Sequence, residues 1–294
     1  MFVQLLINGI MLGSIYALTA IGYSLIYSIL QLINMSNASV FLSSSVFFYI
    51  LYYNNVTGGS VAITFICTLI FAGLLGYLIE VVAIRPIRNK GDGNTYALIS
   101  SIGVKTILEK TCQGTFGSEI HTFPTLLDGK YIRIFGANLK AIQIIIIAVT
   151  ILILVVMTWY TQKTRTGRGL RALSQNINAC HLMGMPVNRL IGISFAVGSA
   201  LAAVSGVAYC MYLSSISISV GSAIGNNAFA ATVLGGIGVL KGAVVGGFIL
   251  GILECFVTGY ISNTASKFVA FGILIVFLFI KPNGIFGKKE QKKV

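Results

Sequence analysis

The stretch AIQIIIIAVTILILVVMTWY, residues 141–160, decides the fold class of this chain. It carries no charged side chain, and a helix of about 20 apolar residues can cross the roughly 30 Å hydrocarbon core of a bilayer. Five further spans of similar character lie at about 3–28, 36–53, 61–84, 190–212 and 242–262, and shorter ones at about 95–112, 226–240 and 266–281. The sequence therefore predicts a protein that crosses the membrane many times.

The composition excludes an ordinary soluble domain. Of the 294 residues, 56% are hydrophobic and only 9% are charged, and the mean hydropathy is +0.91. Backbone groups inside a bilayer must hydrogen-bond within the protein, and the chain lacks the period-two alternation of barrel strands. We predict an all-α fold, with one integral-membrane domain over residues 1–294 and about nine membrane helices, within a range of about eight to ten.

Basic residues gather in three clusters that predict the orientation of the chain. The clusters are Arg85, Arg88 and Lys90; Lys163 to Arg171 with Arg189; and Lys281, Lys288, Lys289, Lys292 and Lys293. Short basic loops stay in the cytoplasm, which puts the C-terminus in the cytoplasm and the N-terminus outside. Parity between the first two clusters requires segment 95–112 to cross as well. We expect a short or broken helix there, because Lys105, Glu109 and Lys110 interrupt its apolar run.

The sequence carries no catalytic signature. His121 and His181 lie far apart, no nucleophile has an obvious base, and no GxxxxGK[ST] phosphate loop is present. The five cysteines form no CxxC pair, and the net charge of +13 lies in loops that membrane topology explains without nucleic acid. We therefore predict no enzyme activity, no metal and no cofactor on this chain, so that any ATP that powers it must bind to another chain.

Small residues recur at four-residue spacing inside the apolar spans. The pairs are Gly9 and Gly13, Ala202 and Gly206, Gly242 and Gly246, and Gly247 and Gly251. This spacing lets helix backbones approach closely. It predicts tight helix packing rather than direct contact with a solute.

Polar side chains within the spans are candidates for a translocation pathway. They are Asn8, Ser14, Tyr16, Asn34, Asn37, Ser39, Ser100, Ser101, Asn226, Asn227 and Glu254. An unpaired polar group in the membrane is costly, so each either lines a water-filled path or hydrogen-bonds between helices. Glu254 is expected past the middle of its span towards the outer face, where it either contacts a solute or pairs with a basic residue such as Lys267.

The polar segment at about 162–189 interrupts the apolar spans with a compact, basic, helix-compatible stretch. It has the character of a docking surface on a transporter that receives its energy from a partner. The candidate docking residues are Gly167, Arg168, Arg171, Asn178, Ala179, Leu182, Met183 and Gly184.

An ordered set of motifs resembles the permease subunits of branched-chain amino-acid ABC importers of the LivH type. The motifs are Asn8-Gly9, Gly13 to Leu18, Leu25-Ile26-Tyr27, Ile33-Asn34, Arg85 to Arg88, Leu98 to Gly103, Thr164 to Ala172, Ala179 to Gly184, Leu234 to Gly238, Gly246-Gly247, Glu254 and Pro282 to Gly287. They cover nearly the whole length. Each motif is weak alone, but their order is specific.

The resemblance implies a type II-like importer in a bacterial plasma membrane. This chain would be one of two permease subunits, the other a paralogue. Two cytoplasmic ATPases would bind ATP and Mg²⁺, and an extracytoplasmic binding protein would deliver leucine, isoleucine, valine or a related amino acid. The short helix around Ala179 to Gly184 would sit in a cleft of the ATPase and couple ATP hydrolysis to transport.

One departure from the family pattern leaves the solute open. After Ile33-Asn34 the family continues with Phe-Ala-His-Gly and an acid, whereas this chain has Met35-Ser36-Asn37-Ala38-Ser39. A permease of the same architecture for urea or a short amide is one alternative. An autonomous secondary transporter is another, although it would need intramembrane acids besides Glu254.

Overall fold

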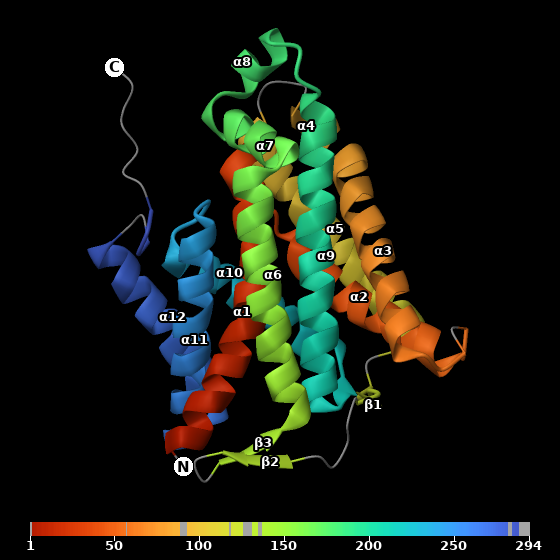
Figure 1. Cartoon of the computed structure of the whole chain (residues 1–294), viewed down its shortest axis with the longest axis vertical. Coiled ribbons are helices and arrows are strands. Elements are labelled where there is room, and N and C mark those ends of the chain that lie inside the picture. Colours follow the sequence, from red (N-terminus) through yellow and green to blue (C-terminus); the bar gives the residue numbers. More distant parts are fainter. Residues whose placement is uncertain are drawn as a thin grey trace.

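The structure is an almost entirely helical bundle (Figure 1). A computed structural model of the chain describes residues 2–56, 58–88, 93–117, 119–125, 131–134, 137–281 and 284–287. The long helices are α1 (Phe2–Leu30), α2 (Ser36–Tyr53), α3 (Val61–Ile79), α5 (Gly93–Phe116), α6 (Ala141–Lys163), α9 (Val187–Leu213), α10 (Ile218–Gly235), α11 (Leu240–Tyr260) and α12 (Asn263–Ile280). The π-helix η1 (Glu80–Ile84) and α4 (Arg85–Arg88) continue α3, and α7 (Arg165–Gln175) and α8 (Ile177–Leu182) form the loop before α9.

Strands contribute only two small sheets among the described residues. Strand β1 (His121–Thr122) pairs antiparallel with β4 (Ser215–Ile216), and β2 (Tyr131–Ile134) pairs antiparallel with β3 (Ala137–Lys140). The predicted all-α class is therefore confirmed. Each of the nine predicted spans corresponds to a long helix, and in the described part of the chain five helices are long and apolar enough to cross a membrane: α1, the continuous α3–α4, α6, α9 and α11.

Two predicted spans differ from the helices observed. Segment 95–112 was expected to be short or broken, but α5 is one continuous helix of 24 residues. Its charges do not break it, because Lys105 and Glu109 stand one turn apart and form an ion pair. Helix α10 begins at Ile218 rather than near 226, and it ends at Gly235 because Gly236 adopts a φ of 107°.

Helices α1 and α9 form the centre of the bundle. Both are mostly buried, and α9 packs against α1, α2 and α3. At their crossing, a Cβ on Gly22 would lie only 2.7 Å from the carbonyl oxygen of Gly198. Beside this contact the hydroxyls of Thr19 and Ser205 lie 2.6 Å apart, and Ser205 donates to the carbonyl of Ile15. Close backbone approach and a buried hydrogen bond thus join the two helices.

The glycines of α11 allow the same close approach on the other side of α1. A Cβ on Gly247 would lie 2.6 Å from the backbone nitrogen of Ala17, and one on Gly13 would lie 2.8 Å from the Cα of Phe248. Gly251 faces Gly13, and Gly246 faces the backbone of α10 at Ala231. The predicted role of the small-residue pairs in tight helix packing is confirmed.

The two ends of the bundle differ in character. The α7–α8 loop and α4 lie at one end, and the N-terminus with the β2–β3 hairpin lies at the other (Figure 1). The first two basic clusters therefore share one end, as the topology prediction requires. Lys90 and the tail lysines Lys288, Lys289, Lys292 and Lys293 lie outside the described residues.

The Gly247 contact yields a test of the packing. We expect Gly247→Val to destabilise the protein by about 3 kcal/mol, the upper end of the usual cost of overpacking, because the new methyl groups meet backbone atoms that cannot move aside. Gly272→Val is the control, since a Cβ there meets nothing within 4 Å. Thermal unfolding of the purified protein in detergent should show a lower melting temperature for Gly247→Val alone. Equal melting temperatures for the two variants would contradict the proposed packing.

Candidate functional site

The loop between α6 and α9 is folded rather than irregular. Thr164 ends α6 and caps α7: its hydroxyl donates to the carbonyl of Tyr160 at 2.6 Å and accepts from the backbone N–H of Gly167 at 3.0 Å. A Cβ on Gly167 would collide with the carbonyl oxygens of Tyr160 and Thr161. This explains why a glycine stands at 167, a predicted docking residue: it lets α7 turn back sharply against the end of α6.

Helix α7 is fixed to the bundle by one face and by two arginines. Leu170 and Leu173 are buried, whereas Arg168 and Arg171 are exposed. Arg168 donates to the carbonyl of Lys163 at 3.3 Å, and Arg171 donates to that of Gln162 at 3.2 Å. These cations bond to free carbonyls at the C-terminal end of α6 and interact favourably with the partial negative charge there. The arginines therefore stiffen the loop as well as charging its surface.

Helix α8 projects furthest from the bundle. The side chain of Asn176 accepts from the backbone N–H of Ala179 and caps it, and Cys180 is buried beneath it. Its outer face is exposed, including the predicted docking residues Asn178, Ala179, Leu182 and Met183. Gly184, with a φ of +72°, makes the return turn. We call Leu182 and Met183 the α8 tip.

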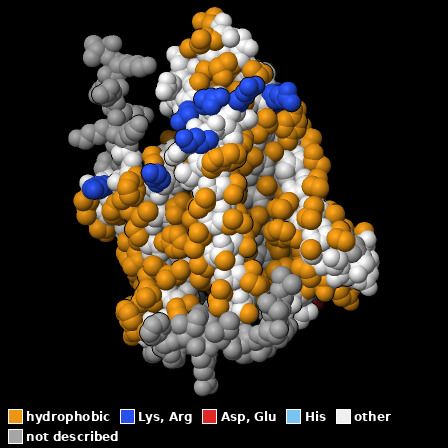
Figure 2. All heavy atoms as spheres, viewed as in Figure 1, with side chains coloured by type: hydrophobic (Ala, Val, Ile, Leu, Met, Phe, Trp, Pro, Cys, Tyr) orange, Lys and Arg blue, Asp and Glu red, His pale blue; other side chains and the backbone are white. Residues whose placement is uncertain are grey.

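The α8 tip is apolar and almost fully exposed. Leu182 is 90% exposed and Met183 is 81% exposed. Figure 2 shows hydrophobic side chains at the extremity of this loop and Lys and Arg side chains gathered in a band below it. Exposed apolar surface rimmed by polar groups is a common feature of protein interaction sites. Of the predicted docking residues, those of α8 and its return turn lie on this projection and Arg168 and Arg171 are exposed on α7, whereas Gly167 is buried against the end of α6.

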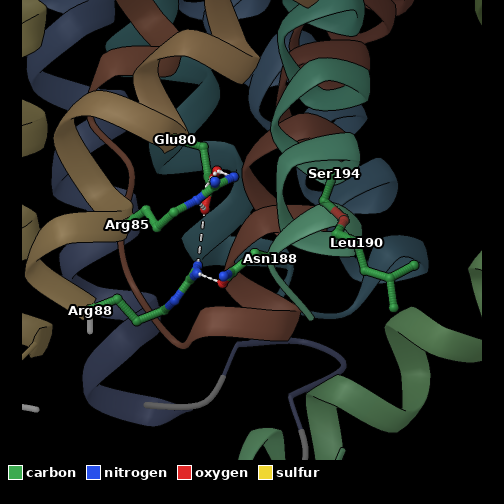
Figure 3. A network of polar contacts seen from close by, with 6 residues as sticks. All are labelled: Glu80, Arg85, Arg88, Asn188, Leu190 and Ser194. Carbon is green, nitrogen blue, oxygen red and sulfur yellow. Dashed lines mark hydrogen bonds and ion pairs between the residues drawn. The ribbon is translucent and has the colours of Figure 1, made fainter. Parts of the chain in front are cut away.

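A buried ionic network lies where α9 leaves the loop (Figure 3). Glu80 is completely buried at the start of η1, and its carboxylate accepts from Arg85 at 2.6 Å and from Arg88 at 3.2 Å. Arg88 also donates to the side chain of Asn188, in the first turn of α9. A π-helix bonds backbone groups five residues apart, and Arg85 follows Glu80 by five residues, so the two side chains lie close together. The network connects α3–α4 directly to α9.

A second polar cluster joins α1, α10 and α11 inside the bundle. Tyr16, fully buried on α1, donates its hydroxyl proton to Glu254 of α11. Asn227 of α10 donates to both carboxylate oxygens of Glu254 at 3.3 Å and to the hydroxyl of Tyr16 at 3.1 Å. Three predicted pathway residues therefore meet. Lys267 was the suggested partner of Glu254, and its side chain is not among those that the structure describes.

The other predicted pathway residues are spread over several contacts. Ser14 and Ser39 bond to carbonyls of their own helices, Asn34 accepts from Ser36 at the start of α2, and Asn8 accepts from Gln143 of α6. Ser101 accepts from the backbone of Met35, Ser100 donates to the carbonyl of Ala83 in η1, and Asn226 accepts from Lys105. Asn37 is buried, and neither of its side-chain polar atoms bonds to a described residue. The contacts of these residues therefore lie on several different helices, and their role in a pathway stays a prediction.

Sequence reasoning missed two groups with charges inside the helical bundle. Glu80 lies within a predicted span, and its spacing of five and eight residues from Arg85 and Arg88 was the available signal. Lys105 and Glu109 were treated as interruptions of a span, although their spacing of four residues is typical of a helical ion pair.

Comparison with known proteins assigns the chain to a family. Residues 5–278 match the model of the family described as branched-chain amino acid transport system / permease component. The chain is 37% identical over 303 aligned positions to the high-affinity branched-chain amino acid transport system permease protein LivH of Salmonella typhimurium, covering 100% of this chain and 98% of the relative. It is 35% identical to the corresponding protein BraD of Pseudomonas aeruginosa, with the same coverage.

A solved structure, PsaBC from Streptococcus pneumoniae in complex with Fab, aligns with 97% of this chain and 94% of its own, at a TM-score of 0.46 and 18% identity. The assignment rests on the two sequence comparisons, which extend over nearly all of the chain. The chain belongs to the family of permease components of branched-chain amino acid transport systems.

Proposed function

We propose that this chain is the membrane subunit of an ATP-driven importer for leucine, isoleucine, valine or a related amino acid, and that ATPase subunits drive it through the α8 tip. The observation that carries the coupling proposal is the pair Leu182 and Met183, 90% and 81% exposed on a capped helix. The solute follows the printed names of full-length relatives at 35–37% identity.

The proposed partners follow from the two ends of the bundle. Two cytoplasmic ATPases, which carry ATP and Mg²⁺, would bind at the end with α7 and α8. A second permease subunit, a paralogue, would complete the pathway. A solute-binding protein would dock at the end with the N-terminus, which would face outwards from a bacterial plasma membrane while the C-terminus lies in the cytoplasm. The basic residues at the α7–α8 end support this orientation.

The coupling would run from the loop into the bundle through α9. Only four residues separate the last residue of α8, Leu182, from the start of α9 at Val187, so displacement of α8 pulls on the first turn of α9. Asn188 in that turn accepts a hydrogen bond from Arg88, and Arg88 forms an ion pair with the buried Glu80. ATP can drive transport only if the ATPases bind one arrangement of these helices more tightly than another. The ionic network would transmit that preference to α3.

The α8 tip gives the first test of this function. We expect Leu182→Asp and Met183→Asp each to lower the amount of ATPase subunit that co-purifies by at least about tenfold, because a desolvated charge would replace an apolar anchor. Both side chains are exposed, so the permease itself should fold normally. Co-purification from detergent extracts and ATP hydrolysis by the complex are the measurements.

Val56→Asp is the matched control for the α8 tip. Val56 is 67% exposed in the turn between α2 and α3, at the opposite end of the bundle, and should retain the ATPases. Normal co-purification with both tip variants would refute the tip as the docking point. A wild-type chain that co-purifies no ATPase would refute the function as a whole.

The network at Glu80 gives a second test. Arg88→Met removes the link to Asn188 but leaves the ion pair of Glu80 with Arg85, so we expect the complex to assemble and hydrolyse ATP. Leucine uptake should fall by roughly tenfold, because the motion of α9 no longer reaches α3 through a charged hydrogen bond. The control is Arg189→Met, an exposed neighbour in the same turn. Equal uptake by the two variants would show that the network is only structural.

A further inference from the structure

Helix α5 carries an ion pair halfway along its length. Lys105 stands 12 residues after the first residue of this 24-residue helix, about 18 Å along its axis at 1.5 Å per residue. Its Nζ lies 3.9 Å from Oε1 of Glu109, one turn further on, and donates to the side chain of Asn226 on α10 at 2.9 Å. The side chains of Lys105 and Glu109 are 19% and 24% exposed. A lysine and a glutamate therefore lie near the middle of α5, at the surface of the chain.

Lys105 and Glu109 have hydrogen-bonding groups that no described residue uses. A separation of 3.9 Å is too long for a hydrogen bond between an ammonium and a carboxylate, which lie at about 2.7–2.9 Å when they bond directly. Within the described structure, Oε1 of Glu109 is buried and accepts no hydrogen bond. The ammonium of Lys105 has three donors, one of which serves Asn226. Both charges can bind a further group without first giving up a close partner.

The adjoining face of α5 mixes polar and small side chains with the exposed isoleucines Ile99, Ile102 and Ile107. It exposes Gly103, Thr106, Lys110, Gln113 and Gly114, at helical spacing along one side. A Cβ added to Gly103 or Gly114 would meet nothing within 4 Å, so the space beside this face is open in the single chain. Charged side chains at mid-membrane cost at least about 2.5–3.5 kcal/mol each against hydrocarbon. Such a face belongs beside water, a solute or another subunit.

We propose that Lys105, Glu109 and Asn226 bind the zwitterionic group of the transported amino acid within the translocation pathway. Lys105 and the amide of Asn226 would hold the solute carboxylate, and Glu109 would hold its ammonium. Ile102, 44% exposed about one turn away, offers apolar surface to the solute side chain. This inference rests on the proposed function. It explains why opposite charges stand one turn apart without closing on each other.

Two properties make the site suitable for transport rather than tight retention. The ion pair of Lys105 and Glu109 can re-form when the solute leaves, so each charge keeps an opposite charge nearby. Asn226 lies next to Asn227, which bonds to Tyr16 and Glu254 in the bundle interior. On α10, Asn226 therefore faces Lys105 and Asn227 faces the bundle interior. The hydrogen bonds of Asn227 fix this part of α10 and with it the position of Asn226.

The main test compares four variants of the whole importer. We expect Lys105→Met, Glu109→Gln and the double variant to lower initial uptake of labelled leucine by at least roughly tenfold, because each removes a charged hydrogen-bond partner of the solute. Basal ATP hydrolysis and subunit assembly should stay within about twofold of wild type. Lys241→Met, at an exposed lysine on α11, is the matched control and should transport normally.

The double variant separates a solute site from a structural ion pair. If the two charges only stabilise α5, neutralising both together restores transport to near the wild-type rate, and this result would overturn the proposal. Normal uptake by either single variant, or loss of subunit assembly in all three, would overturn it as well. A wild-type complex that hydrolyses ATP in response to its binding protein but imports no leucine would instead refute the proposed solute class.

A second measurement locates the face without relying on transport. In membrane vesicles, Thr106→Cys should react with a charged, water-soluble methanethiosulfonate, and Ile151→Cys on the exposed side of α6 should not. The parent chain with its five native cysteines provides the background rate. Failure of position 106 to react would show that this face is sealed from water and would overturn the proposal, whether or not the complex transports leucine.

Discussion

The bundle depends on how closely α1 approaches its two main neighbours. Glycines at the α1–α9 and α1–α11 crossings leave no room for a Cβ, so the backbones themselves form the contact. In a bilayer the hydrophobic effect does not hold helices together, and close packing with buried hydrogen bonds takes its place. The bond between Thr19 and Ser205 is one such contact. Helix α1 thereby becomes the fixed element around which α9, α10 and α11 are arranged.

The charged groups of the bundle differ in how closely they are bonded to their neighbours. At the end with the α7–α8 loop, the carboxylate of Glu80 is buried against two guanidinium groups. Further inside, Glu254 is held by a phenol and an amide from two other helices. The less tightly held charges, Lys105 and Glu109, lie where α5 meets the surface of the single chain. The carboxylates of Glu80 and Glu254 are closely bonded to other helices, whereas the longer ion pair of Lys105 and Glu109 is the one that we propose as the solute site.

The sequence alone predicts the class and most of the helices, because twenty apolar residues and a basic loop are local signals. It also predicts a folded, exposed loop, since the polar stretch 162–189 interrupts that pattern; its role in docking stays a prediction. It does not predict where α10 begins, which depends on the extended backbone at Ser217, or that α5 is unbroken. Nor does it predict which polar residues meet: Tyr16 and Glu254 are 238 positions apart, and only the packing of α1 against α11 brings them together.

The exposed α8 tip also bears on the life of the subunit before assembly. Leu182 and Met183 present apolar surface to water at the end of a capped helix. A newly inserted chain without its partner therefore displays the kind of feature that chaperones and proteases recognise. Its abundance in the cell would then follow the supply of the subunit that covers the tip. The surface that we propose as the ATPase contact would also report, during biogenesis, whether the importer is complete.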